Sequence, residues 1–143
     1  AVAFNGQTIY EVRYGADGAL RGQRYGPQLN VDAVDSSVSG DVQIPEGVWS
    51  RFNVAVASGG NRFVVAFVGE DADGVGVFTT GIDDAGVPLL PPRRMSPIGL
   101  DVESPQIAWN GEAFGLSYFV RDGDQGRTHN GVTQMVEGRF DCR

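Results

Sequence analysis

The feature of this 143-residue sequence that most constrains its fold is a hairpin pattern that occurs three times. Each copy has a short apolar strand, a tight turn that contains glycine, and a second apolar strand. The copies cover residues 2–9, 56–63 and 107–114, so they start 54 and then 51 residues apart. A repeat of about fifty residues is typical of stacked antiparallel units, none of which buries its apolar faces alone.

Strand patterns dominate the sequence, and no long window places apolar residues at helical spacing. We therefore expect a nearly all-β fold. Asn5-Gly6, Gly59-Gly60 and Asn110-Gly111 stand at the matching place in each copy and favour the positive φ angles of two-residue hairpin turns. The strands expected after these turns cover residues 8–14, 62–68 and 113–121.

The second copy is the most complete. Turns rich in acids and glycine at residues 71–74 and 83–86 introduce two further strands. We expect those strands at residues 75–82 and 87–90, which gives four strands joined by three turns. Pro91-Pro92 then marks the crossing to the third copy, since proline belongs at sheet edges. The third copy follows the same plan and stops before a fourth strand.

The first copy fits the repeat less well. Alignment by its Asn-Gly turn gives an offset of 54, whereas alignment of residues 16–20 with residues 84–88 gives 68. We expect that a strand is missing here, or that the opening residues belong to a different strand. The polar residues 30–46 predict a long loop that has room for one short strand at residues 41–44.

Residues 104–121 resemble the first half of a repeat found in many secreted bacterial β-propeller proteins, and residues 78–95 resemble its second half. The shared features are a proline, an apolar-alanine pair, an aromatic-Asn-Gly turn and an Asp-rich turn. The match covers about residues 53–141, with Ser58 and Gly59 standing where the repeat has an aromatic residue and asparagine. Kelch and sialidase-type repeats match less well.

The resemblance implies a partial β-propeller of two to three four-stranded antiparallel blades within a single all-β unit, residues 1–143. The approximate blades are residues 1–52, which are irregular, 53–103, and 104–143, which are truncated. Propellers typically have four to eight blades. We therefore expect another protein chain, or further blades of the same polypeptide, to complete the ring.

The composition of the sequence disfavours some classes of binding partner. The net charge is −7 and every basic residue is arginine, with no basic cluster, which disfavours nucleic acid and anionic lipid surfaces. No apolar run approaches the roughly twenty residues of a membrane-spanning helix, so we expect no membrane insertion. The sequence does not begin with Met, which fits a processed or excised segment. Together with the resemblance, this predicts a secreted or surface-exposed bacterial protein.

Two single residues are candidates for contacts with other molecules. Cys142, the one cysteine, follows a strand-like run and is predicted either to form an interchain disulfide or to be buried as a small apolar residue. Trp49 follows the irregular segment and is our candidate ligand-binding aromatic residue, because saccharides stack on exposed indoles. Trp109 lies in the repeated turn, where packing is its expected role.

Metal chemistry is weakly indicated. Acid pairs occur at two equivalent turns, Asp71 with Asp73 and Asp122 with Asp124. Calcium takes six to eight oxygen ligands, so two carboxylates fall short, and we interpret both pairs as solvated hairpin turns. We predict no metal and no cofactor.

Catalytic residues are not apparent either. His129 is the single histidine and lies in a loop context, without partners for a zinc site or a relay. Glycoside hydrolysis needs two carboxylates. The strands expected to line a propeller channel carry instead Val54, Val56, Ile107 and Ala108.

The sequence therefore predicts a non-enzymatic binding or assembly module of a secreted or surface bacterial propeller protein, with a protein chain, further blades or a glycan as its partner. Two alternatives remain. One is a fragment of a propeller enzyme, such as a glycoside hydrolase, whose catalytic residues lie on a missing segment. The other is a small lectin that closes its ring by oligomerisation.

Overall fold

The computed structural model describes residues 1–15, 17–28, 31–44, 53–121 and 136–138. These residues form β-strands, turns and connections without any helix, which confirms the all-β prediction. In this part of the chain there is accordingly no helix of the length and apolarity that crossing a membrane requires.

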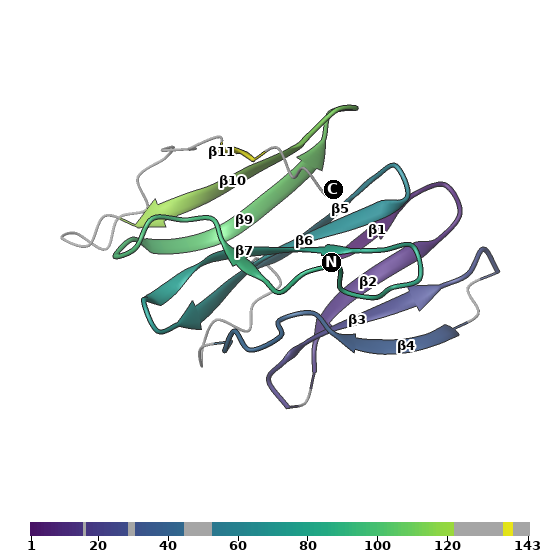
Figure 1. Ribbon diagram of the computed structural model, residues 1–143, viewed down its shortest axis with the longest axis horizontal. Helices are drawn as coiled ribbons and strands as arrows, with labels where there is room; N and C mark the ends of the chain where they lie inside the picture. Colours follow the sequence, from purple (N-terminus) through teal and green to yellow (C-terminus); the bar gives the residue numbers. More distant parts are fainter. Residues whose placement is uncertain (16, 29–30, 45–52, 122–135, 139–143) are drawn as a thin grey trace.

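The strands form three antiparallel sheets, each built from strands that are consecutive in the sequence (Figure 1). The N-terminal sheet contains β1 (Val2–Phe4), β2 (Ile9–Tyr14), β3 (Leu20–Tyr25) and β4 (Val31–Ser37). The middle sheet contains β5 (Val54–Gly59), β6 (Arg62–Asp71), β7 (Gly74–Ile82) and β8 (Arg93–Arg94). The C-terminal sheet contains β9 (Asp101–Trp109), β10 (Phe114–Arg121) and β11 (Val136–Gly138), with β10 in its centre.

The three repeated hairpins are the first two strands of each sheet. At both Asn-Gly turns the asparagine side chain closes the turn: the Oδ1 atoms of Asn5 and Asn110 each accept hydrogen bonds from the second and third following amides at 2.8–3.0 Å. Gly6 and Gly111 have φ of +96° and +106°, whereas neither asparagine has positive φ. The glycine therefore supplies the left-handed backbone and the asparagine supplies the cap.

The middle hairpin has Gly59 in place of asparagine because aromatic rings of the C-terminal sheet occupy the space. A Cβ atom at Gly59 would lie 2.6–2.8 Å from ring atoms of Trp109 and Phe114. These two rings pack with centroids 4.7 Å apart. The departure from the repeat is thus a packing requirement between neighbouring sheets.

The middle sheet is buried on both faces and lies between the other two sheets (Figure 1). In β6 every residue from Phe63 to Gly69 is buried. Phe63 and Phe67 belong to the core shared with the N-terminal sheet, where the Tyr10 and Phe63 rings stack with centroids 5.2 Å apart. Ala66 belongs to the core shared with the C-terminal sheet. A strand covered on both sides reads as a continuous apolar run rather than an alternating one.

The sheets stack so that positions that correspond in the repeat lie next to each other. β5 contacts both β1 and β9, so the first strands of the three sheets are neighbours. Ser58 Oγ donates to the Phe4 carbonyl at 2.7 Å, and Ser104 N donates to Asn53 Oδ1 at 3.2 Å. These pairs are 54 and 51 residues apart, the two offsets of the sequence repeat. The stacking register therefore follows the repeat.

The prediction of a long loop at residues 30–46 was wrong, because residues 31–37 form β4 and complete a four-stranded N-terminal sheet. The strand was not recognised because it contains serines, which break the apolar pattern of a strand. The structure shows that Ser36 makes hydrogen bonds. Ser36 Oγ donates to the Gly86 carbonyl at 2.9 Å and lies 3.3 Å from Tyr10 Oη. The short strand expected at residues 41–44 is a single bridge between Gln43 and Glu70.

Two further expectations need correction. The fourth strand of the middle sheet is Arg93–Arg94 and not residues 87–90, where one bridge joins Pro88 to Ile82. The alignment of residues 16–20 with residues 84–88 was also wrong. The turn at Gly18 joins β2 to β3, so its counterpart is the turn that joins β6 to β7. The turn at residues 83–86 also combines aspartate with glycine, and this similarity to Asp17-Gly18 suggested the false alignment.

The close approach at Gly59 predicts a specific sensitivity to side-chain size. We expect Gly59→Ala to lower the free energy of unfolding by about 1–3 kcal/mol, because the rings of Trp109 and Phe114 must move apart. Gly81→Ala is the matched control, since its Cβ would meet Leu89 at 3.6 Å, an ordinary contact. Urea unfolding of both variants measures the difference. Equal stability of the two variants would contradict the packing argument.

Candidate functional site

A groove of about 640 Å³ lies between the turn ends of the middle and C-terminal sheets. The apolar residues of its lining are Leu89, Leu90, Pro91, Trp109 and Phe114, among others. The polar side chains of its lining include Arg62, Thr79, Thr80, Arg93 and Glu112. Apolar surface with a few convergent polar groups is the usual composition of a ligand site.

Trp109 is the dominant aromatic residue of the groove. It ends β9, directly before the Asn-Gly turn, and its side chain packs on Phe114 and over Gly59. It nevertheless stays 37% exposed. The sequence predicted a packing role for Trp109, and the structure gives it that role together with an open face toward the groove.

The opposite wall is held by hydrogen bonds to β7. Leu89 N donates to the Gly81 carbonyl at 2.8 Å, and Thr80 Oγ1 donates to the Leu90 carbonyl at 2.9 Å. The Leu90 side chain is 63% exposed. This wall was not predicted from the sequence, because residues 87–90 were expected to form a strand. The signal was present in the adjacent leucines before Pro91, which are too apolar for an ordinary exposed connection.

Charged groups come from both sheets. Arg62 and Arg93 begin β6 and β8 of the middle sheet, while Glu112 lies in the β9–β10 turn. Guanidinium donors and a carboxylate acceptor beside an indole suit a ligand with many hydroxyl groups and an apolar face. Glu112 is the one carboxylate among the described residues of the groove, whereas glycoside hydrolysis requires two.

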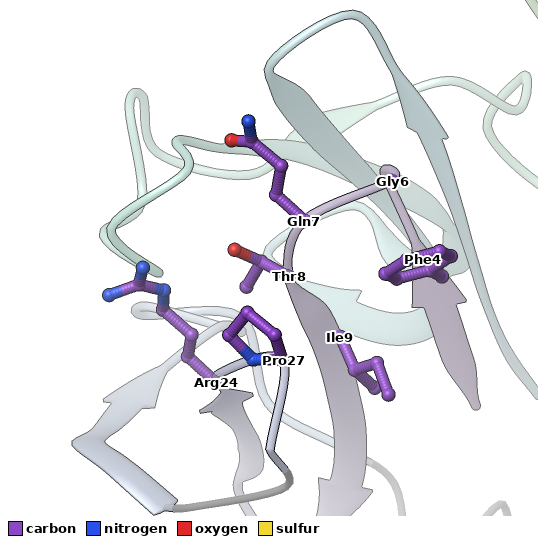
Figure 2. A pocket seen from close by; sticks show the side chains of 7 residues that line it. All are labelled: Phe4, Gly6, Gln7, Thr8, Ile9, Arg24 and Pro27. Carbon is purple, nitrogen blue, oxygen red and sulfur yellow. The ribbon is translucent and has the colours of Figure 1, made fainter.

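A second hollow of about 590 Å³ lies at the β1–β2 turn of the N-terminal sheet (Figure 2). In Figure 2 the side chains of Phe4 and Ile9 lie on one side of the chain, and the polar ends of Gln7, Thr8 and Arg24 lie on the other. Phe4 is 58% exposed. The lining of this hollow is therefore mixed, with apolar and polar side chains on different sides.

Asp71, a calcium candidate in the sequence, is engaged by Arg94. Its carboxylate accepts from both Nε and Nη2 of Arg94, and this guanidinium also donates to the Val75 carbonyl at 3.1 Å and lies over the Phe78 ring. Asp71 Oδ1 further accepts from Asp73 N at 2.9 Å. Arg94 thus ties the two sides of this turn together by an ion pair and a hydrogen bond. Within the described ranges, no group of three or more His, Cys, Asp or Glu residues is placed to hold a metal ion.

The side chains with shifted pKa values lie outside the groove. The hydrogen bond from Arg94 lowers the pKa of Asp71, and that from Arg21 lowers the pKa of Asp17. Burial raises the pKa of Tyr14 to about 12 and also raises that of Tyr118. The hydrogen bond to Glu11 raises the pKa of Tyr25. None of these side chains lines the groove, so they report structural contacts.

Several predicted residues lie outside the described part of the chain. These are Trp49, Asp122, Asp124, His129 and Cys142. Of the four residues expected to line a channel, Val54 is buried, Val56 and Ile107 pack against the two inter-sheet cores, and Ala108 is exposed.

Comparisons with known proteins leave this geometry as the main guide to function. No protein-family model, no curated protein and no solved structure matches the chain. The interpretation of the groove therefore depends on its own residues.

The Asp71–Arg94 pair predicts a pH dependence. Because the pKa of Asp71 in the folded chain lies below its ordinary value of 3.8, the pair stabilises the fold above pH 3.8. That stabilisation is lost as the pH falls from 3.8 through the folded pKa. We expect Asp71→Asn to be less stable than wild type at pH 7, and the gap to shrink below pH 3.8.

Asp73→Asn is the control for this experiment, since it removes the same charge from the same turn without touching Arg94. Urea unfolding at pH 7 and at several values below 3.8 measures both variants. A gap for Asp71→Asn that stays constant across this range, or an equal pH response of Asp73→Asn, would show that the pair does not titrate as stated.

Proposed function

We propose that this chain supplies three blades of a β-propeller and acts as a non-enzymatic binding module that takes a glycan in the groove between its middle and C-terminal sheets. The observation that carries the proposal is the 37% exposure of Trp109, which lines the groove together with guanidinium and carboxylate groups. The cell surface or the exterior is the compartment that the sequence resemblance favours for such a module.

The stacking of the sheets supports the propeller. Blades of a propeller are consecutive antiparallel sheets arranged around an axis, with their first strands nearest to it. Here each sheet follows the chain order, and β5 contacts β1 on one side and β9 on the other. Hydrogen bonds between positions 54 and 51 residues apart give the neighbouring sheets a common register.

The chemistry of the groove supports a glycan. A sugar ring presents an apolar face that stacks on an indole and hydroxyl groups that pair with charged and polar side chains. Trp109 supplies the stacking surface, and Arg62, Arg93 and Glu112 supply donors and an acceptor around it. The proposal joins two functions expected from the sequence, the binding module and the lectin, and replaces Trp49 by Trp109 as the central aromatic residue.

Glycan-array screening followed by titration of the best-bound glycan tests this function. We expect Trp109→Ala to weaken binding at least about tenfold, the loss of roughly 1.4 kcal/mol of contact energy. Trp109→Phe retains part of the affinity, because a smaller ring still stacks. Circular dichroism verifies that each variant is folded.

Trp49→Ala is the matched control, since it removes the other tryptophan. We expect its affinity to equal that of the wild type. Failure to bind any glycan, or loss of binding in Trp49→Ala with full binding in Trp109→Ala, would refute the assignment of the groove.

A further inference from the structure

The outer face of the N-terminal sheet, which we define as the face turned away from the middle sheet, corresponds to a covered face in the other two sheets. On the second strands, the positions that face the preceding sheet are Phe63, Val65 and Phe67 in the middle sheet and Phe114, Leu116 and Tyr118 in the C-terminal sheet. The equivalent positions of the N-terminal sheet are Ile9, Glu11 and Arg13. This face is therefore apolar near the turn and charged at its far end.

The first strands show the same contrast. Val56 and Ile107 pack against the two inter-sheet cores, whereas Val2 at the matching position is 64% exposed. Trp109 covers Gly59 of the preceding sheet, whereas Phe4 at the matching position is 58% exposed. Val2, Phe4 and Ile9 thus form an outer strip where a preceding sheet would lie.

The outer face of the C-terminal sheet, on the other end of the stack, has the complementary shape. Near the turn it carries Gly115 and Ala108, which are cross-strand partners. They stand at the positions of Val64 and Ala57, which are cross-strand partners in the middle sheet, and the glycine in place of a valine leaves room for a bulky strip. Phe119 adds a large apolar residue at 41% exposure farther along the same face.

We infer that the outer face of the N-terminal sheet of one copy packs on the outer face of the C-terminal sheet of a second copy, so that two copies close a ring of six sheets. The inference rests on the propeller in the proposed function and names its partner. Such head-to-tail contacts close when the rotation between copies permits it. Six blades lie within the usual range of propellers.

The size of the contact favours a closed pair over an open one. The C-terminal sheet limits the contact, because its three described strands total 20 residues and cover roughly 300 Å². One contact between two copies therefore buries about 600 Å² in total, which is the size of a weak or lattice contact, whereas two contacts bury about 1,200 Å², the lower end of the range of stable interfaces. A ring held by two contacts is therefore the stable form.

Sedimentation equilibrium or native mass spectrometry of the full chain under reducing conditions tests the inference, because reduction removes any bridge through Cys142. We expect the wild type to have twice the 15.2 kDa mass of one chain. Phe4→Glu and Phe119→Glu, on opposite faces, are each expected to be monomeric. Ile98→Glu, which replaces an exposed apolar residue in the β8–β9 connection, away from both faces, is expected to stay dimeric.

The measured mass distinguishes a ring of two copies from a ring that is completed by further sheets of the same polypeptide. A monomeric wild type would overturn the inference and leave further sheets of the same polypeptide as the partner. Dissociation of only one of the two variants, or of Ile98→Glu as well, would also overturn it, because a head-to-tail contact needs both faces and only those. If a glutamate variant does not fold, the serine variant at the same position, Phe4→Ser or Phe119→Ser, is measured in its place. Glycan binding by the monomeric variants, whose groove is intact, tests the proposed function separately.

Discussion

Burial of the middle sheet on both of its faces is the interaction on which the whole arrangement depends. Strand β6 sends Phe63, Val65 and Phe67 to one neighbour and Ala66 to the other, and the two resulting cores join all three sheets. A lone four-stranded sheet would leave both apolar faces in water, at roughly 25 cal/mol for each Å² of apolar area. The sheets are therefore stable as a stack, and their relative register is fixed by the same packing.

Features governed by local chemistry were predictable from the sequence. The all-β fold and the three hairpins followed from strand periodicity and from the turn residues, because Asn5 and Asn110 act on amides two and three residues away. Features governed by distant contacts were not. β4 was missed because Ser36 bonds to Tyr10 and Gly86 instead of entering an apolar pattern, and Gly59 was explained only when Trp109 was found packed over it.

The candidate site includes residues outside the repeat, which is why the repeat pattern did not predict it. Trp109 was assigned to packing because its position is repeated, yet its neighbours in the groove come from the non-repeated segment at Leu89 and Leu90. Repeated positions serve turns and cores, so a repeat predicts architecture better than binding. The groove unites one repeated aromatic residue with side chains that the repeat does not specify, including Arg93 at the edge of the middle sheet.

The brevity of β8 has a consequence for how the molecule avoids uncontrolled association. An outermost strand with many free amides and carbonyls invites strands of other molecules to pair with it. β8 has two residues, both arginines, and the guanidinium of Arg94 folds back onto the β6–β7 turn. The β8 edge of the middle sheet is thereby so short and so strongly charged that it offers little backbone for a strand of another molecule to pair with.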